Sequence, residues 1–347
     1  MPMTTVLCTL YNSLYLDKGL VLYDSLCACA KDFKLYVLCM DDRCYEVLMD
    51  LNQDRHIPVR LVDFEEGDED LLIAKGNRPV GEYCWTCSSS FIRYVLKRYN
   101  EPICTYIDAD MYFYTDPQIL VDEMLEAGKS VMVTPHRFPA KDEKQAEIVG
   151  TYCVEFNTFR NTSDSLEVLE YWRNRCLECC TNLGDGIHWG DQKYLEELVD
   201  RFSNVYVCKN NGAGVAPWNI VLYSSPVNGS GMSMLRYNTS KEDIPLFFYH
   251  FQSVKYIDRH EINTGVFTHK GIDYDLVDSL YYPYLRNIEE KKKYLESNYN
   301  IDLLIKKHPT DKNMSLFEKV LYFFSIRRQL LKLKLNILNI HPYIIKI

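Results

Sequence analysis

Two aspartates interrupt one of the most apolar stretches of the chain. The segment 105–115 reads TYIDADMYFYT, and only Ala109 separates Asp108 from Asp110. If both belong to a strand, their side chains point to the same face and the two carboxylates lie side by side. Like charges this close raise each other's pKa, and a divalent cation relieves the repulsion. Because carboxylate oxygens suit Mg²⁺ and Mn²⁺, the pair predicts a metal site.

The elements around this segment predict where that site lies. Runs with strand and helix spacing alternate over the first third of the chain, which is typical of βαβ units and a mostly parallel sheet. The aspartates would then lie at the carboxyl edge of the sheet, where open α/β folds bind ligands. The alternative is an ordinary turn that one aspartate begins, while the other caps a neighbouring element. The expected strands are 4–12, 33–40, 59–64, 103–114, 130–135, 152–161 (antiparallel in one interpretation), 204–209 and 245–251, and the expected helices are 15–29, 41–51, 88–99, 164–180 and 190–202.

The charge is unevenly distributed along an otherwise ordinary composition. The chain has 347 residues, 47% hydrophobic and 25% charged, which is enough for one large α/β domain or two smaller ones. From residue 303 onward, nine basic and two acidic residues give +7, which leaves −16 for the rest of a chain whose net charge is −9. An acidic body with a basic, apolar tail is not the pattern of a nucleic-acid binder. It fits a body held at an anionic membrane surface.

The tail itself allows two interpretations. Leu316–Ile340 combines large apolar residues with lysines and arginines. It predicts either a helix in the membrane interface or a terminal helix packed on the domain with its charges in water. The N-terminus lacks the features of a signal peptide, and no apolar run is long enough to span a membrane. These features predict a cytoplasmic protein, with peripheral association at the inner face of the cell membrane as an option.

The 13 cysteines are expected to be reduced, buried thiols in such a compartment. Two CxxC pairs, Cys84 with Cys87 and Cys176 with Cys179, raise the alternative of a structural zinc site. Their separation along the chain is far outside the usual spacing of zinc ribbons, so buried thiols are the favoured interpretation.

The order of several short motifs resembles the GT-A glycosyltransferases, most closely the retaining family that includes bacterial lipopolysaccharide galactosyltransferases and glycogenin. The resemblance extends from Val6 to Tyr256 through NSLYLDKGLVLYDSL, SSSFIRYVLKRY, the DAD sequence, EFNTFRN, WGDQKYL and FFYHFQSVKY. It implies a GT-A (Rossmann-like) catalytic domain at 1–270, with a mixed, mostly parallel sheet flanked by helices. A helical, basic C-terminal extension would follow at 271–347.

The resemblance also implies roles for particular residues. Three would hold the metal, Mn²⁺ or Mg²⁺: Asp108, Asp110 and His250. The residues that would bind the donor are Thr9, Tyr11, Asn12, Tyr15, Arg93, Asp108, Ala109, Asp110 and Lys255. Among these, Tyr15 is the best-placed ring for the nucleobase and Tyr11 the next, while Arg93 and Lys255 would face the diphosphate. The residues at the reacting sugar would be Asp191, Gln192 and Asn157. In addition, a late loop with Trp218 and Asn219 could form part of the acceptor pocket.

The sequence departs from that family at several places, and several of its residues have simpler interpretations. Phe159 stands where the family has a glycine, and the histidine motif lacks its usual glycine and Lys-Pro-Trp ending and brings Lys255 one residue closer to His250. The N-terminal segment has no acidic residue for the nucleobase, so Thr9 and Asn12 would have to make that contact. Taken singly, His250 could be a core histidine and Arg93 a helix residue whose charged end reaches solvent. Likewise, Asn157 could end a strand and Asp191 could cap a helix.

The predicted function is metal-dependent transfer of a sugar from a nucleotide-diphosphate sugar, preferably UDP-linked, to a saccharide or lipid-linked acceptor. Retention of configuration and a role in surface polysaccharide or lipopolysaccharide synthesis follow from the resemblance. One alternative, a nucleotidyltransferase that makes the sugar nucleotide, would carry a Gly-rich basic loop after the first strand, and TLYNSLYLDKG is not one. GAGVAPWN is not a phosphate loop either. The other alternative is a catalytically inactive scaffold of the same fold at the membrane.

Overall fold

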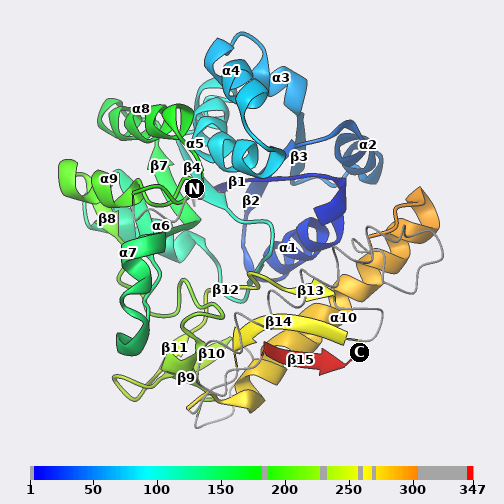
Figure 1. Cartoon of the computed structure of the whole chain (residues 1–347), viewed down its shortest axis with the longest axis vertical. Coiled ribbons are helices and arrows are strands. Elements are labelled where there is room, and N and C mark those ends of the chain that lie inside the picture. The colour runs from blue at the N-terminus through cyan, green and yellow to red at the C-terminus, as the bar shows by residue number, and fades with distance from the viewer. Residues whose placement is uncertain are drawn as a thin grey trace.

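The structure, a computed structural model, describes residues 4–181, 187–226, 233–256, 261–267, 271–303 and 342–346. At its centre is a sheet made of β1 (Thr5–Tyr11), β2 (Phe33–Cys39), β3 (His56–Arg60), β4 (Ile103–Ile107), β6 (Val131–Pro135), β7 (Tyr152–Arg160) and β8 (Val205–Val207) (Figure 1). The order across the sheet is β3-β2-β1-β4-β7-β6-β8. All neighbours are parallel except β7, which is antiparallel to both β4 and β6. This confirms the predicted α/β class with a mixed, mostly parallel sheet.

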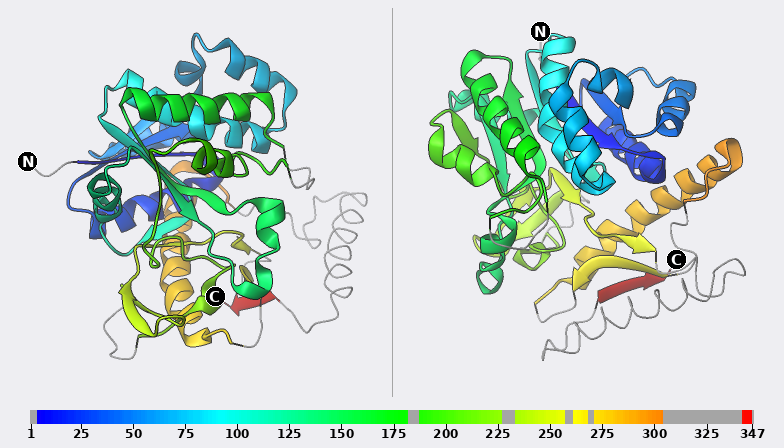
Figure 2. Two further views of the ribbon diagram at one scale, coloured as in Figure 1. Left: turned by 90° about the vertical axis from the view of Figure 1, so that its left-hand side faces the viewer. Right: turned by 45° about the horizontal axis from the view of Figure 1, so that its top comes forward.

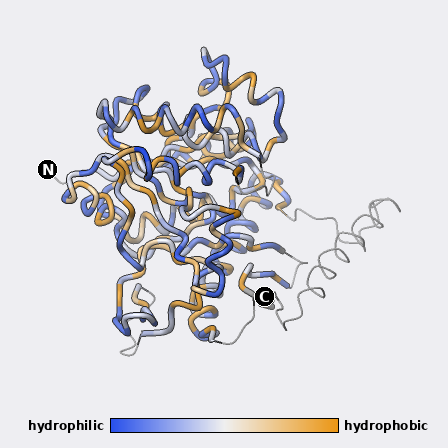
Figure 3. Tube along the Cα trace, turned by 60° about the vertical axis from the view of Figure 1, so that its left-hand side comes forward, coloured by the Kyte–Doolittle hydropathy of each residue, from blue (hydrophilic) through white to orange (hydrophobic). Residues whose placement is uncertain are grey.

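Helices cover both faces of the central sheet (Figure 2). One face packs against α1 (Leu16–Cys29), α2 (Asp42–Leu51) and α6 (Gln118–Glu126). The other face packs against α3 (Leu61–Glu65), α4 (Glu69–Asn77), α5 (Val80–Arg98), α8 (Ser163–Glu178) and α9 (Leu195–Arg201). Because both faces are covered, the inner strands are apolar on both sides, as in β2 with its sequence FKLYVLC. The outer helices alternate between hydrophobic and hydrophilic positions, as expected for helices with one buried side (Figure 3).

Smaller elements lie beside the carboxyl edge of the sheet. β5 (Met111–Phe113) leaves the central sheet and pairs with β12 (Phe248–His250). The other short elements are η1 (Ser13–Tyr15), η2 (Ala140–Asp142), α7 (Gln145–Val149), η3 (Ile220–Leu222), β9 (Tyr223–Ser224), β10 (Met234–Tyr237), β11 (Glu242–Pro245), β13 (Lys255–Tyr256), β14 (Glu261–Phe267) and β15 (Pro342–Lys346). A long helix of 26 residues, α10 (Tyr274–Tyr299), follows β14 along the chain. β9, β10 and β11 form one small sheet, and β13, β14 and β15 form another.

Two of the expected strands differ from the structure. The segment predicted as a strand at 59–64 is the end of β3 followed by the helix α3, and β3 begins earlier, at His56. β3 contains Pro58, which an edge strand tolerates because one side of its backbone has no partner strand. The segment predicted as one strand at 103–114 is two strands, because the chain turns after Ile107 to reach β12.

The C-terminal part of the chain is described only in pieces. In Figure 1, α10 lies along α1, and β15 pairs with β14 in the small sheet. The tail predicted to be helical at 316–340 lies outside the described residues, and the division into 1–270 and 271–347 stays a prediction. Within the described ranges, no helix is both long and apolar enough to cross a membrane.

Candidate functional site

The predicted metal ligands meet at the end of β4. That strand ends at Ile107, and Asp108 and Asp110 lie in the turn that leads to β5 rather than in a strand. The pairing of β5 with β12 sets His250 opposite Met111, directly beside this turn. His250 Nε2 lies 3.0 Å from Asp110 Oδ1 and 3.7 Å from Asp108 Oδ2. The structure therefore brings the three residues together, although His250 is 140 positions away from Asp110 in the sequence.

The chemical types of these three donor atoms suit a small divalent cation. Metal–ligand bonds of about 2.1 Å in octahedral geometry place neighbouring donor atoms about 3 Å apart, a spacing that the 3.0 Å between His250 Nε2 and Asp110 Oδ1 matches and the 3.7 Å between His250 Nε2 and Asp108 Oδ2 exceeds. Two carboxylate oxygens and one imidazole nitrogen form a donor set that suits Mn²⁺ or Mg²⁺. The Asp108 side chain is 30% exposed, against 15% for Asp110 and 5% for His250. A ligand would therefore approach the site from the Asp108 side.

The electrostatics of the cluster favour positive charge at its centre. Burial tends to raise the pKa of Asp110, but the charge and hydrogen bond of His250 outweigh it and hold that pKa well below its usual range. Burial also tends to lower the pKa of His250, but Asp110 and other acceptors outweigh it and raise that pKa. The pKa of Asp108 is raised to about 6, chiefly by burial. A proton on His250 Nε2 and a metal cation would thus compete for the same position beside Asp110.

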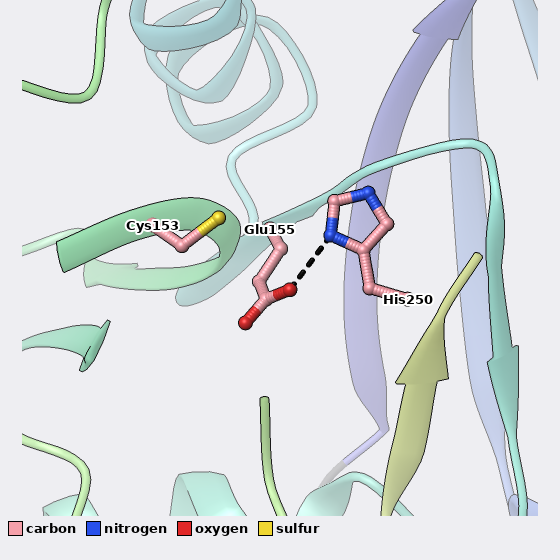
Figure 4. Close-up of side chains that lie close together, drawn as sticks. All are labelled: Cys153, Glu155 and His250. Atoms are coloured by element: carbon pink, nitrogen blue, oxygen red, sulfur yellow. Dashed lines mark hydrogen bonds and ion pairs between the residues drawn. The ribbon is translucent and has the colours of Figure 1, made fainter. Parts of the chain in front are cut away.

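A third carboxylate holds the far side of the histidine ring. Glu155 Oε2 lies 2.7 Å from His250 Nδ1, and both side chains are buried (Figure 4). Cys153, Glu155 and His250 form a group of three residues whose ligand atoms all lie within 4.8 Å of one another, and neither aspartate belongs to it. A carboxylate on one ring nitrogen fixes the ring orientation and directs the other nitrogen to a metal. Glu155 is not among the residues predicted from the sequence, although it is an acid within an apolar strand, the same signal that singled out Asp108.

Within the described residues, buried polar side chains without hydrogen-bond partners lie on the two strands that flank β4. Asn157 on β7 pairs across the sheet with Tyr106 on β4, two residues before Asp108. Within the described part of the chain, neither the oxygen nor the nitrogen of the Asn157 amide has a hydrogen-bond partner, and the same holds for the hydroxyl of Thr9 on β1. Leaving a buried polar group unpaired costs about 1–3 kcal/mol, so such groups call for an explanation. Hydrogen bonds to a bound ligand would supply one.

Asp191 approaches the cluster from the α5 and α8 side of the sheet. It accepts a hydrogen bond of 2.6 Å from the Ser88 hydroxyl, and its backbone oxygen accepts one of 2.9 Å from Trp172 Nε1. Its pKa is raised to about 7, chiefly by burial, while the Ser88 hydrogen bond opposes the rise and the charge of Asp108 adds to it. Asp191 is not the N-cap of α9, because that helix begins only at Leu195.

The remaining candidates near the sugar and acceptor positions have structural partners. Gln192 donates its side-chain amide to the backbone oxygen of Val149 at 2.6 Å. Trp218 Nε1 donates to the His136 backbone oxygen, and the Trp218 ring stands edge-on to the His250 ring with centroids 5.6 Å apart. Asn219 is buried and also donates to the His136 oxygen. Trp218 therefore lies beside the cluster, while Asn219 supports the loop beneath it.

The two candidate tyrosines have different environments. Tyr11 is buried at the end of β1, and its hydroxyl is 3.1 Å from His56 Nε2. Tyr15 is 39% exposed, and Lys18 Nζ lies 4.2 Å from the centroid of its ring. Tyr15 rather than Tyr11 thus offers a ring face to a ligand. Asn12 uses its side chain locally, to cap η1.

Arg93 and Lys255 are not brought to the cluster by any contact that the structure shows. Arg93 lies on the side of α5 that faces α8, where it forms an ion pair with Glu170. The same glutamate accepts a hydrogen bond of 3.0 Å from Lys97. Lys255 is exposed on β13, opposite Asn263 of β14. The segment predicted to be helical at 88–99 corresponds to the later part of α5, but local spacing does not specify which neighbour each side of that helix faces.

An open α/β sheet with a carboxylate and histidine cluster at its carboxyl edge defines this chain as an α/β protein with a candidate cation site. No protein-family model matches the chain. The Bacillus subtilis (strain 168) protein YfnD, described as uncharacterized, is 30% identical over 288 residues, which cover 81% of this chain and 88% of YfnD. The chain therefore belongs to the same family as YfnD. YfnF of the same organism, also described as uncharacterized, is 28% identical over 86% of this chain and 97% of its own length.

Solved structures with which the chain aligns include one described as a xylosyltransferase and one described as a glycosyltransferase. Mouse xyloside xylosyltransferase 1 in its apo form is 13% identical and aligns with 72% of this chain and 98% of its own, with a TM-score of 0.47. The glycosyltransferase GlyE of Streptococcus pneumoniae TIGR4 is 12% identical and aligns with 84% of this chain and 64% of its own, with a TM-score of 0.45.

Proposed function

We propose that the chain is a metal-dependent glycosyltransferase that uses a nucleotide-diphosphate sugar, preferably a UDP-sugar, as its donor. The observation that carries the proposal is the convergence of Asp108, Asp110 and His250 Nε2 at the carboxyl edge of the sheet. The order of sequence motifs supports it independently, since the residues that the GT-A resemblance nominates as metal ligands are the ones that meet. Tyr15 offers an exposed ring just after β1, and Asn157 on β7 offers a buried amide that has no hydrogen-bond partner within the described residues.

The residues of the cluster suit the demands of such a transfer. When bound, a divalent cation would neutralise the charge that develops on the departing diphosphate. Asp108 and Asp110 would hold it by their carboxylates, and His250 by Nε2. The sugar ring gains positive charge in the transition state, and a polar, mildly negative surface stabilises that charge. Asp191 supplies a carboxylate for this surface, and Asn157 supplies an amide oxygen.

The acceptor is proposed to be a saccharide or a lipid-linked saccharide, with Trp218 at the edge of its pocket. Aromatic side chains combine a flat apolar face with a polar edge, which suits binding to a sugar. The family resemblance favours retention of configuration. It also favours a role in surface polysaccharide or lipopolysaccharide synthesis at the cytoplasmic side of the membrane. The basic tail supports a membrane setting through its charge alone.

Calorimetric titration of UDP, with and without Mn²⁺, tests the proposal directly. We expect micromolar binding that requires Mn²⁺ and that is lost in Asp110→Ala. Asp54→Ala is the matched control, because Asp54 is an exposed acid in the turn before β3, away from the cluster. A screen of UDP-sugars for donor hydrolysis would follow a positive result. No binding of UDP under any metal condition would refute the UDP assignment, and GDP- and CMP-linked donors would be tested next.

A further inference from the structure

We propose that Lys18 is the residue that pairs with the donor's diphosphate, and that its ammonium group occupies the donor's path until the donor binds. The inference rests on the proposed function, because it assigns a role within the same site. It concerns a residue that neither the sequence motifs nor the family resemblance nominates for the diphosphate, where the resemblance points to Arg93 and Lys255.

The position of Lys18 is unfavourable for a lysine unless it has a specific partner. α1 begins at Leu16, so Lys18 lies in its first turn, where the helix dipole disfavours a cation. Its side chain is only 14% exposed, and a buried charge is costly unless it is paired. Within the described residues, Lys18 Nζ lies 3.9 Å from Asp110 Oδ2 and 4.2 Å from the centroid of the Tyr15 ring, and the charge of the adjacent Asp17 also acts on it. Asp110 belongs to the candidate metal site, and Tyr15 is the ring that the family resemblance assigns to the nucleobase.

This places the ammonium group between the two ends of a nucleotide diphosphate. The family resemblance places the nucleobase on Tyr15, and in the proposed function the diphosphate reaches the cation at Asp108 and Asp110. A phosphate chain that joins these two positions must pass the Lys18 ammonium, which touches both. Arg93 cannot serve in its present conformation, because it is paired with Glu170 on the α8 side of α5.

The same charge should therefore act in opposite directions on the metal and on the nucleotide. A divalent cation that binds alone is repelled by an ammonium group that is already paired with Asp110. When the nucleotide is present, the ammonium group can leave Asp110 and pair with phosphate oxygens in a charge-assisted hydrogen bond. Lys18 thus opposes binding of the free metal but favours the metal and the nucleotide together, which is a positive coupling between the two ligands.

Titrations of Lys18→Met and Lys18→Arg test this inference, because methionine keeps the length of the side chain and arginine keeps its charge. Lys31→Met is the matched control, since Lys31 is exposed just beyond the other end of α1. For Lys18→Met, we expect Mn²⁺ alone to bind about tenfold more tightly, and UDP at saturating Mn²⁺ to bind about tenfold more weakly. Lys18→Arg should restore most of the UDP affinity, and Lys31→Met should behave as the wild type.

The outcomes separate this inference from the proposed function. If Lys18→Met leaves both affinities unchanged, or weakens both equally, the inference is wrong while a wild type that binds Mn²⁺ and UDP still supports the proposed function. If the wild type itself binds neither Mn²⁺ nor UDP, both are overturned. Thermal melting of each variant without ligand shows whether the fold is intact, and an intact Lys18→Arg variant with no recovered UDP affinity also counts against the inference.

Discussion

Replacing Glu155 by glutamine tests whether the histidine of the cluster is oriented for a metal. The carboxylate lies 2.7 Å from His250 Nδ1, and Glu155 is completely buried. Glutamine keeps the shape of the side chain and can still accept one hydrogen bond from Nδ1, but the negative charge is lost. The pocket should therefore stay filled, while the imidazole becomes a weaker and less firmly held ligand at Nε2.

The structure sets the size of the expected effect. A hydrogen bond to a charged group contributes about 1.5–3 kcal/mol, and glutamine replaces it by a neutral bond of about 0.5–1.5 kcal/mol. The difference of about 1–2 kcal/mol corresponds to about 5- to 30-fold in affinity for Mn²⁺. The direct loss of negative charge near a divalent cation adds to this, so the overall reduction should lie within the roughly 10- to 100-fold range usual for residues that support a metal ligand.

The assay is a calorimetric titration of Mn²⁺ into the wild type and two variants. The control is Glu101→Gln, because Glu101 is also a buried glutamate and it is paired with Lys34 and Tyr36 at a different place in the fold. We expect reduced Mn²⁺ affinity in Glu155→Gln alone. Unchanged Mn²⁺ affinity in a folded Glu155→Gln variant would refute the claim that this carboxylate orients a metal ligand.

Three further changes test other parts of the structure. Ser88→Ala removes the hydrogen bond that opposes the raised pKa of Asp191, which is about 7, so the acid limb of the pH profile of donor hydrolysis should move up by about one pH unit; an unmoved limb would mean that Asp191 does not act in its ionised form. His56 has its pKa lowered to about 3 by burial, so the unfolded chain takes up a proton below about pH 6.5 that the folded chain does not. Folding stability from this residue is therefore full above pH 6.5 and should fall by about 2.5 kcal/mol between pH 7 and 4.5, a loss that His56→Gln should abolish in urea unfolding at the two pH values; an equal loss in the variant would contradict this. Trp172→Phe leaves the backbone oxygen of Asp191 without its 2.9 Å donor and should cost about 1–3 kcal/mol by urea unfolding, whereas a cost below about 0.5 kcal/mol would argue against the importance of that bond.

The sequence by itself predicted the fold class, because local periodicity reports which faces of each element are buried. Alternating strand and helix spacing identified the α/β class and a mostly parallel sheet, and acids within an apolar run singled out Asp108 and Asp110. It erred at 59–64, where Leu61–Glu65 forms a short helix rather than the end of a strand. Periodicity cannot separate two such short elements when both bury their apolar residues against the same core.

Only the tertiary structure decided which side chains meet. Glu155 and His250 lie on β7 and β12, and their contact depends on how β5 leaves the central sheet to pair with β12. Local sequence does not encode that pairing, which long-range packing determines. The same packing turns Arg93 toward Glu170 and leaves Lys18 beside Asp110. The sequence therefore determined which chemical groups are present and which sheet edge carries the aspartates, while the packing of distant elements determined which groups share a site.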